Sequence, residues 1–274
     1  MTNEQITLAS KKEYFCNSRF ISGRIMEYDI KAANISMLRE SNIISDELYR
    51  YLLAIDKQNR ERFIGWQIKK EIEESKNRSA IDGSITYRTI YEGITNAKIQ
   101  LFEANNILPN EVVRISNDAV YINRSSDLSV FKFGDYIEFK QKMIADNAIK
   151  LSSTLIIFYW NNTNGLNLEV KGIGDKQKAL EHQQYMLSFI ASVLLTYERA
   201  GTLDAIHLIE DFYNDYINRK LPKQFYKELN SFSMYKIINS GYYLLDIDDI
   251  NLLDISYNGN LIRELWKIIM TRYK

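Results

Sequence analysis

Few residues of this chain can serve the commonest chemistries of enzymes and metalloproteins. The 274 residues include one cysteine, Cys16, and two histidines, His182 and His207. One cysteine cannot form an internal disulfide framework or a thiolate zinc cluster. Two histidines leave little material for most catalytic triads. The two prolines, Pro109 and Pro222, allow long helices to run without interruption.

The chain also lacks an excess of charge of either sign, because 35 lysines and arginines are balanced by 35 aspartates and glutamates. That balance argues against a dedicated nucleic-acid coat protein but leaves local basic patches open. No run approaches the roughly 18 apolar residues of a membrane span, and the N-terminus lacks the apolar region of a signal peptide. We expect a cytoplasmic protein without membrane association. The abundance of Ile, Asn, Lys and Tyr suggests an AT-rich genome such as that of a phage, which would place the protein in the host cytoplasm.

Hydrophobic periodicity in the first half predicts both strands and helices. Alternation over residues 24–29 predicts a strand that ends near Asp29, and near-helical spacing predicts a helix over 30–40. Ser45 is expected to cap one long helix that runs to about residue 74. Within it, Gly65 would mark a bend or a close approach.

After a helix over 87–105, β-rich runs predict three strand pairs. The first covers 112–116 and 119–122 and turns at Asn117-Asp118, since both residue types tolerate positive φ. The second, over 130–139, turns at 134–135, and the third joins 155–160 to 166–170.

From about residue 175 the pattern predicts helices only, over 179–198, 203–217 and 252–270. We interpret the acidic run 246–249 as the start of a helix rather than a calcium loop. These patterns predict an α+β fold, with a mixed or antiparallel sheet and long helices in a domain over 1–173 and a helical domain over 174–274.

Two aspartates stand where a rigid sheet could hold them together. Asp29 is expected at a strand end and Asp118 in a hairpin turn. Two carboxylates on adjacent strands can bind a pair of divalent cations, Mg²⁺ or Mn²⁺, which activate a hydroxyl and stabilise the leaving phosphate in phosphoryl transfer. The order of strand, helices and hairpin is that of a nucleotidyltransferase palm.

The segment 28–35, with Asp29, resembles motif A of family-B DNA polymerases. The segment 115–122 is similar to their motif C hairpin, and matching the apolar residues that follow puts Asp118 on the second metal-binding aspartate. The resemblance covers about residues 24–145 and implies a palm-like sheet. It implies that the following residues bind nucleotide or nucleic acid: Asn34 at the sugar, Lys57, Arg60 and Arg62 at the triphosphate, and Lys140 or Lys142 at the primer.

The chain departs from that family at several positions. Ser116 replaces the first aspartate of motif C, and Asn34 stands in the place of the sugar-gating tyrosine. The core of motif B is absent, with only a loosely similar segment at 60–65. Met143 and Ile144 follow Lys142, so that the Lys-x-Tyr signature fails, and no exonuclease region precedes residue 29.

Structural interpretations of the same residues stay open. Asp29 could cap the following helix, Asp118 could be an ordinary turn residue, and Lys57 could pair with Glu61 across one helical turn. The tyrosines are expected at the rim of the core, with satisfied hydroxyls.

We predict a palm-like protein associated with nucleic acid or nucleotide. It would carry out two-metal nucleotidyl transfer, as a DNA or RNA polymerase does, with Asp29 and Asp118 as catalytic metal ligands. The alternative is a non-catalytic interaction or regulatory protein, encoded by a phage or mobile element, that binds a protein partner through its C-terminal helices.

Overall fold

A computed structural model describes residues 18–74, 84–152, 154–163, 165–172, 181–228, 235–238, 241–244, 253–254 and 256–273. The chain forms two compact units. The first comprises Met1–Ser18 and Ser22–Asp146, and the second comprises Arg19–Ile21 and Asn147–Lys274. The cysteine and the acidic run 246–249 lie outside the described residues.

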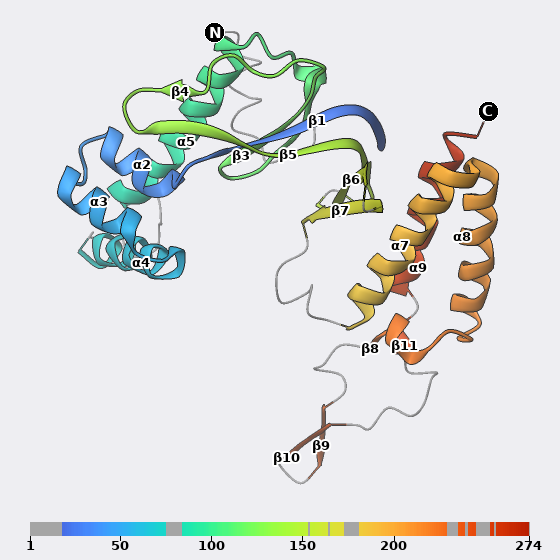
Figure 1. Cartoon of the computed structure of the whole chain (residues 1–274). Helices are drawn as coiled ribbons and strands as arrows, with labels where there is room; N and C mark the ends of the chain where they lie inside the picture. The colour runs from blue at the N-terminus through green and yellow to red at the C-terminus, as the bar shows by residue number, and fades with distance from the viewer. Residues whose placement is uncertain are drawn as a thin grey trace. The chain divides into compact units, whose positions relative to one another are not determined.

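The first unit is built on antiparallel strands (Figure 1). Its hydrogen-bonded order is β2-β3-β1-β5, and β4 pairs with β5. In register, Asp29 of β1 lies opposite Ala119 of β3. The strands are β1 (Phe20–Ile30), β2 (Val112–Ile115), β3 (Ala119–Asn123), β4 (Lys132–Phe133) and β5 (Ile137–Lys150).

Helices supply the apolar cover of this sheet. They are α2 (Ala33–Glu40), α3 (Asp46–Ala54), α4 (Lys57–Glu74) and α5 (Ile85–Ala104). Met26, Tyr28 and Ile30 of β1 share one buried cluster with apolar residues of α2 and α5. Because strand side chains alternate between faces, Glu27 and Asp29 lie on the other face. The core thus fixes the direction in which Asp29 points.

The segment after β1 corrects the expected helix over 30–40. Ile30 belongs to the strand, and the helix begins at Ala33. Its N-cap is Ala32, which has a left-handed conformation with φ 48° and makes no side-chain capping bond. The interpretation of Asp29 as a helix cap is therefore wrong.

The single helix expected from Ser45 to about residue 74 is two helices. Ser45 does cap the first, since its side chain accepts a hydrogen bond from the Leu48 N–H. The break falls at Ile55 and Asp56, where the Asp56 carboxylate accepts from the Asn59 N–H at 2.9 Å and so satisfies the start of a new helix. The close approach predicted at Gly65 is wrong, because no atom lies near the position of a Cβ, and α4 continues through this residue.

The hairpin predicted at Asn117-Asp118 is confirmed. The Ser116 N–H donates to the Ala119 carbonyl at 2.9 Å, which closes the turn between β2 and β3. Neither turn residue has a positive φ, so the reason given for choosing this pair was wrong although its place was right. The pairs expected around 134–135 and between 155 and 170 are also present.

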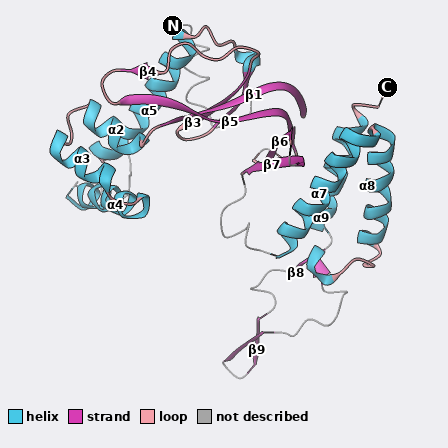
Figure 2. Ribbon diagram, viewed as in Figure 1, coloured by secondary structure: helices cyan, strands magenta, loops and turns pink. Residues whose placement is uncertain are grey.

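The second unit contains a strand pair and three helices (Figure 2). Apolar side chains of these elements share one buried cluster. The pair is β6 (Ile156–Asn162) and β7 (Gly165–Lys171), and the helices are α7 (Glu181–Ala200), α8 (Thr202–Ile217) and α9 (Ser256–Met270). The prediction of helices alone is wrong here. Short strands also occur: β8 (Lys227–Glu228), β9 (Tyr235–Ile238), β10 (Gly241–Leu244) and β11 (Leu253–Asp254).

The fold class is α+β, as predicted, with antiparallel pairing in the sheet. The domain boundary predicted from the sequence is at residue 173. The chain divides into its two compact units between Asp146 and Asn147, inside β5. The pair β6–β7 accordingly belongs to the same unit as the helices. In the part of the chain that the structure describes, no helix is long and apolar enough to span a membrane.

Candidate functional site

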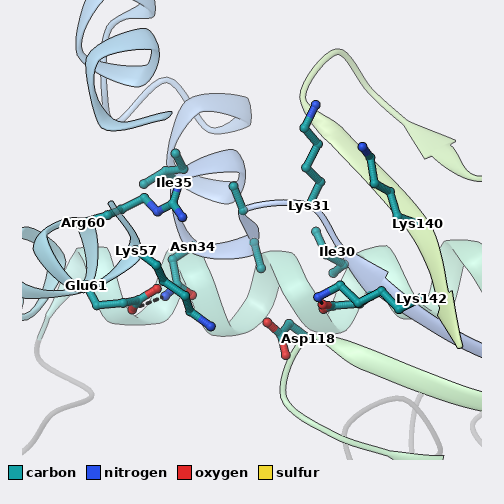
Figure 3. A pocket seen from close by; sticks show the side chains of 13 residues that line it. Ile30, Lys31, Asn34, Ile35, Lys57, Arg60, Glu61, Asp118, Lys140 and Lys142 are labelled. Carbon is teal, nitrogen blue, oxygen red and sulfur yellow. Dashed lines mark hydrogen bonds and ion pairs between the residues drawn. The ribbon is translucent and has the colours of Figure 1, made fainter. Parts of the chain in front are cut away.

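A pocket in the first unit lies where β1 ends (Figure 3). Its walls come from the link between β1 and α2, the first turns of α4, the β2–β3 turn and β5. It is lined by Asp29, Ile30, Lys31, Ala32, Ala33, Asn34, Ile35, Lys57, Arg60, Glu61, Asp118, Lys140 and Lys142. Five of these side chains are cationic and three are acidic, so that the pocket has an excess of positive charge in a chain with none.

Asp29 is the most enclosed charged group of the pocket. The residue is only 8% exposed, and its Oδ1 has no hydrogen-bond partner. Its Oδ2 forms an ion pair with Lys142 Nζ. Burial raises the pKa of Asp29, the hydrogen bond from Lys142 lowers it, and the negative charge of Asp118 raises it. Oδ1 is thus a buried carboxylate oxygen that no described residue satisfies.

Backbone pairing brings Asp118 beside Asp29. The Ile30 N–H donates to the Asp118 carbonyl at 2.9 Å, and Asp29 faces Ala119, the next residue of β3. The Asp118 side chain points into the pocket (Figure 3). The two aspartates proposed from the sequence therefore line one site.

Lys98 supports the turn that carries Asp118. This α5 residue is buried, and its Nζ donates to the carbonyls of Ser116 and Asn117 at 3.4 and 3.3 Å. We did not identify Lys98 from the sequence. The available signal was a lysine on the buried face of the predicted helix, four residues after Ile94 and three before Leu101.

Cationic side chains surround the acidic groups. Lys57 and Arg60 extend from the first turns of α4, Lys31 follows β1, and Lys140 lies on β5 (Figure 3). None of these four makes an ion pair within the described part of the chain. Lys31 was not proposed from the sequence, and its place directly after a strand end was the signal for it. Charges without partners at one pocket are suited to an anionic ligand.

Asn34 and Glu61 join α2 to α4 across the pocket. The Asn34 Nδ2 donates to Glu61 Oε2 at 2.9 Å. Glu61 therefore binds Asn34 rather than Lys57, and the interpretation of Lys57 and Glu61 as a helical ion pair is wrong. Lys57 is left exposed at the pocket mouth.

Arg62 is the one proposed site residue outside the pocket. It is exposed on α4, and its Nη1 contacts Asn59 Oδ1 at 3.5 Å. Two residues along a helix turn the side chain through about 200°. Arg60 and Arg62 consequently leave α4 in different directions, and of the two only Arg60 lines the pocket. The role predicted for Arg62 stays a prediction.

Tyr28 and Tyr121 lie inside the core rather than at its rim, so their predicted location is wrong, although their hydroxyls are satisfied as predicted. Tyr121 donates to Glu27 Oε1 at 2.8 Å, and the Tyr28 hydroxyl accepts from the Leu128 N–H at 3.3 Å. His207 is exposed on α8.

The donor set of the pocket is compatible with a hard divalent cation. Asp29 and Asp118 supply carboxylate oxygens, the ligands that Mg²⁺ and Mn²⁺ prefer, and Oδ1 of Asp29 is buried without a partner. In the described ranges no group of three or more His, Cys, Asp or Glu side chains is gathered for a metal. Substrate oxygens would have to complete the coordination, as they commonly do for Mg²⁺.

The chain is thus an α+β protein with a mixed-charge pocket at a sheet end, in which two aspartates lie among lysine and arginine side chains. A family model described as bacteriophage PBS1 gene 130 protein matches residues 3–271, and the chain belongs to this family. The expectation of a phage protein is confirmed at this level. No curated protein matches the chain.

Proposed function

We propose that this phage protein carries out metal-dependent nucleotidyl transfer on a nucleic acid. The observation that carries the proposal is the meeting of Asp29 and Asp118 in a pocket with an excess of cationic side chains. Sequence resemblance to motifs A and C of family-B DNA polymerases selects the same two aspartates. The resemblance rests on sequence motifs and the pocket rests on the structure, and both point to the same two aspartates.

Asp29 and Asp118 would hold Mg²⁺ or Mn²⁺. A metal bound there lowers the pKa of an attacking hydroxyl and neutralises the charge of the transferred phosphoryl group. Lys57 and Arg60 would bind the phosphates of the nucleotide, with Asn34 near its sugar. Lys140 and Lys142, on β5, would contact the nucleic-acid strand that receives the nucleotide.

The first test is primer extension and terminal transfer with Mg²⁺ or Mn²⁺, comparing the wild type with Asp29→Asn and Asp118→Asn. We expect incorporation that falls at least about a hundredfold in each variant, because a lost metal ligand removes several kcal/mol of transition-state stabilisation. Incorporation that survives in either variant would remove that aspartate from the mechanism. Circular dichroism of each variant checks that the fold is retained.

A second candidate is a non-catalytic protein that binds a partner through its C-terminal helices. The observation in its favour is an apolar pocket between α8 and α9, lined by Ile209, Tyr213, Ile262 and Trp266. Its rim carries Glu210, Arg263 and Lys267. This candidate predicts that Trp266→Ala removes a specific binding partner in infected cells, whereas Asp29→Asn leaves that partner bound.

A further inference from the structure

Lys142 stands apart from the other cations of the pocket because it touches an acidic group. Its Nζ forms an ion pair with Asp29 Oδ2, although 57% of the Lys142 side chain is exposed. Lys140, two residues earlier on the same strand, lines the same pocket and makes no ion pair within the described residues. The two lysines therefore have the same charge and neighbourhood but different contacts.

This ion pair conflicts with the role proposed for Asp29. Two positive charges a few ångströms apart repel strongly at low dielectric constant, and the nearby Asp118 cannot neutralise both an ammonium and a divalent cation. Oδ1 of Asp29 is buried and Oδ2 holds Lys142, so a metal that approaches this carboxylate from solvent meets the Lys142 ammonium. The exposed lysine stem can move at small cost, whereas the strand-bound aspartate cannot.

We propose that Lys142 is an exchangeable internal cation, which neutralises Asp29 until a divalent metal takes its place. The displaced ammonium stays on β5 at the edge of the same pocket, where it is free to bind an anionic group such as a nucleic-acid phosphate. Metal binding at Asp29 and phosphate binding at Lys142 are then linked. This inference rests on the proposed metal site and adds that the Lys142 ammonium competes with the metal for Asp29.

The test is isothermal titration of Mn²⁺ into the full chain, comparing the wild type with Lys142→Met and Lys140→Met. If Lys142 competes with the metal, Lys142→Met binds Mn²⁺ at least about tenfold more tightly than the wild type. Lys140→Met removes the same charge from the same pocket without freeing Asp29, so its affinity should change less than about threefold. Lys142→Arg, which keeps the positive charge, should bind no more tightly than the wild type.

Three results would overturn the inference. Weaker Mn²⁺ binding by Lys142→Met would mean that the lysine holds the carboxylate in place rather than competing for it. Equal tightening in both methionine variants would reduce the effect to overall charge. Absence of saturable Mn²⁺ binding in all four proteins would overturn the proposed metal site, and this inference with it. Lys142→Gln replaces the methionine variant if circular dichroism shows that the latter is unfolded.

Discussion

Ala32, directly after the strand that carries Asp29, holds a backbone conformation that alanine rarely adopts. Its φ of 48° and ψ of 44° lie in the left-handed region, where a Cβ costs roughly 1–2 kcal/mol. The residue lines the pocket, and strain of this kind often accompanies functional sites. The link between β1 and α2 thus carries backbone strain at the wall of the pocket.

We predict that Ala32→Gly raises the free energy of unfolding by about 0.5–1 kcal/mol, because glycine relieves the left-handed strain and loses part of that gain in unfolded-state entropy. Urea denaturation measures the change. Ala97→Gly, in the middle of α5, is the control and should destabilise by about 1 kcal/mol or more. A loss of stability in Ala32→Gly would show that this backbone is not strained.

Arg60 and Arg62 form a natural pair for testing the cationic wall. Arg60 lines the pocket and Arg62 lies outside it on the same helix. We expect Arg60→Met to weaken binding of ATP or dATP about tenfold or more, because a charge-assisted hydrogen bond to phosphate contributes roughly 1.5–3 kcal/mol. Arg62→Met should change the affinity less than about twofold. Equal effects in a fluorescence titration would mean that phosphate binds elsewhere.

At the residue scale, the sequence predicts the position of a residue within a strand or turn better than its contacts. Local pattern placed Asp29 at a strand end and Asp118 in a turn, and both positions are correct. The contact between Asn34 and Glu61, and that of Lys98 with the turn, join elements distant in the sequence. No periodicity encodes such contacts, which depend on how helices pack on the sheet.

At the scale of the elements, one carboxylate on α4 holds the start of α5 through hydrogen bonds. Glu71 accepts hydrogen bonds from the Ser84 hydroxyl at 2.6 Å and from the Thr86 N–H and hydroxyl at 2.9 and 2.6 Å. Burial raises the pKa of Glu71, but the hydrogen bonds from Ser84, Thr86 and Gln67 outweigh it and lower the pKa to about 2. The charged form therefore stabilises the start of α5.

We predict that Glu71→Gln destabilises the protein by about 1 kcal/mol at pH 7, a value reduced for solvent screening. Because the pKa is lowered on folding, this stabilisation is complete above the ordinary value of 4.5 and is lost as pH falls toward 2. The difference between the two proteins in urea denaturation should therefore shrink as the pH falls from about 5 to about 3.5, through the ordinary pKa of 4.5. Glu73→Gln, which loses only an exposed pair with Lys69, should cost less than about 0.5 kcal/mol.

Element boundaries were predictable where a side chain signals them. Ser45 marked the start of α3, whereas the break before α4 was missed because Asp56 lies inside a continuous apolar stripe. Asp56 is itself a good capping residue, and its signal was outweighed by periodicity. The short strands of the second unit, such as β8 and β11, were missed because two residues carry no alternation.

For the molecule as a whole, the balanced amino-acid composition does not indicate the local concentration of charge in the folded chain. A chain with zero formal charge places five cationic and three acidic side chains around one pocket. The overall balance argued against a nucleic-acid coat protein, which is compatible with a local anion site. The fold class and three hairpins followed from the sequence, but the concentration of charge needed the tertiary structure.

The measurement that tests the central claim most directly is isothermal titration of Mn²⁺ into the wild type and an Asp29→Asn/Asp118→Asn double variant. The matched control is Asp135→Asn/Asp146→Asn, which makes the same charge change at exposed residues outside the pocket. We predict saturable binding heat in the wild type and the control, and its loss in the pocket variant. Equal heat in all three proteins, or none in the wild type, would contradict a metal site at the two aspartates.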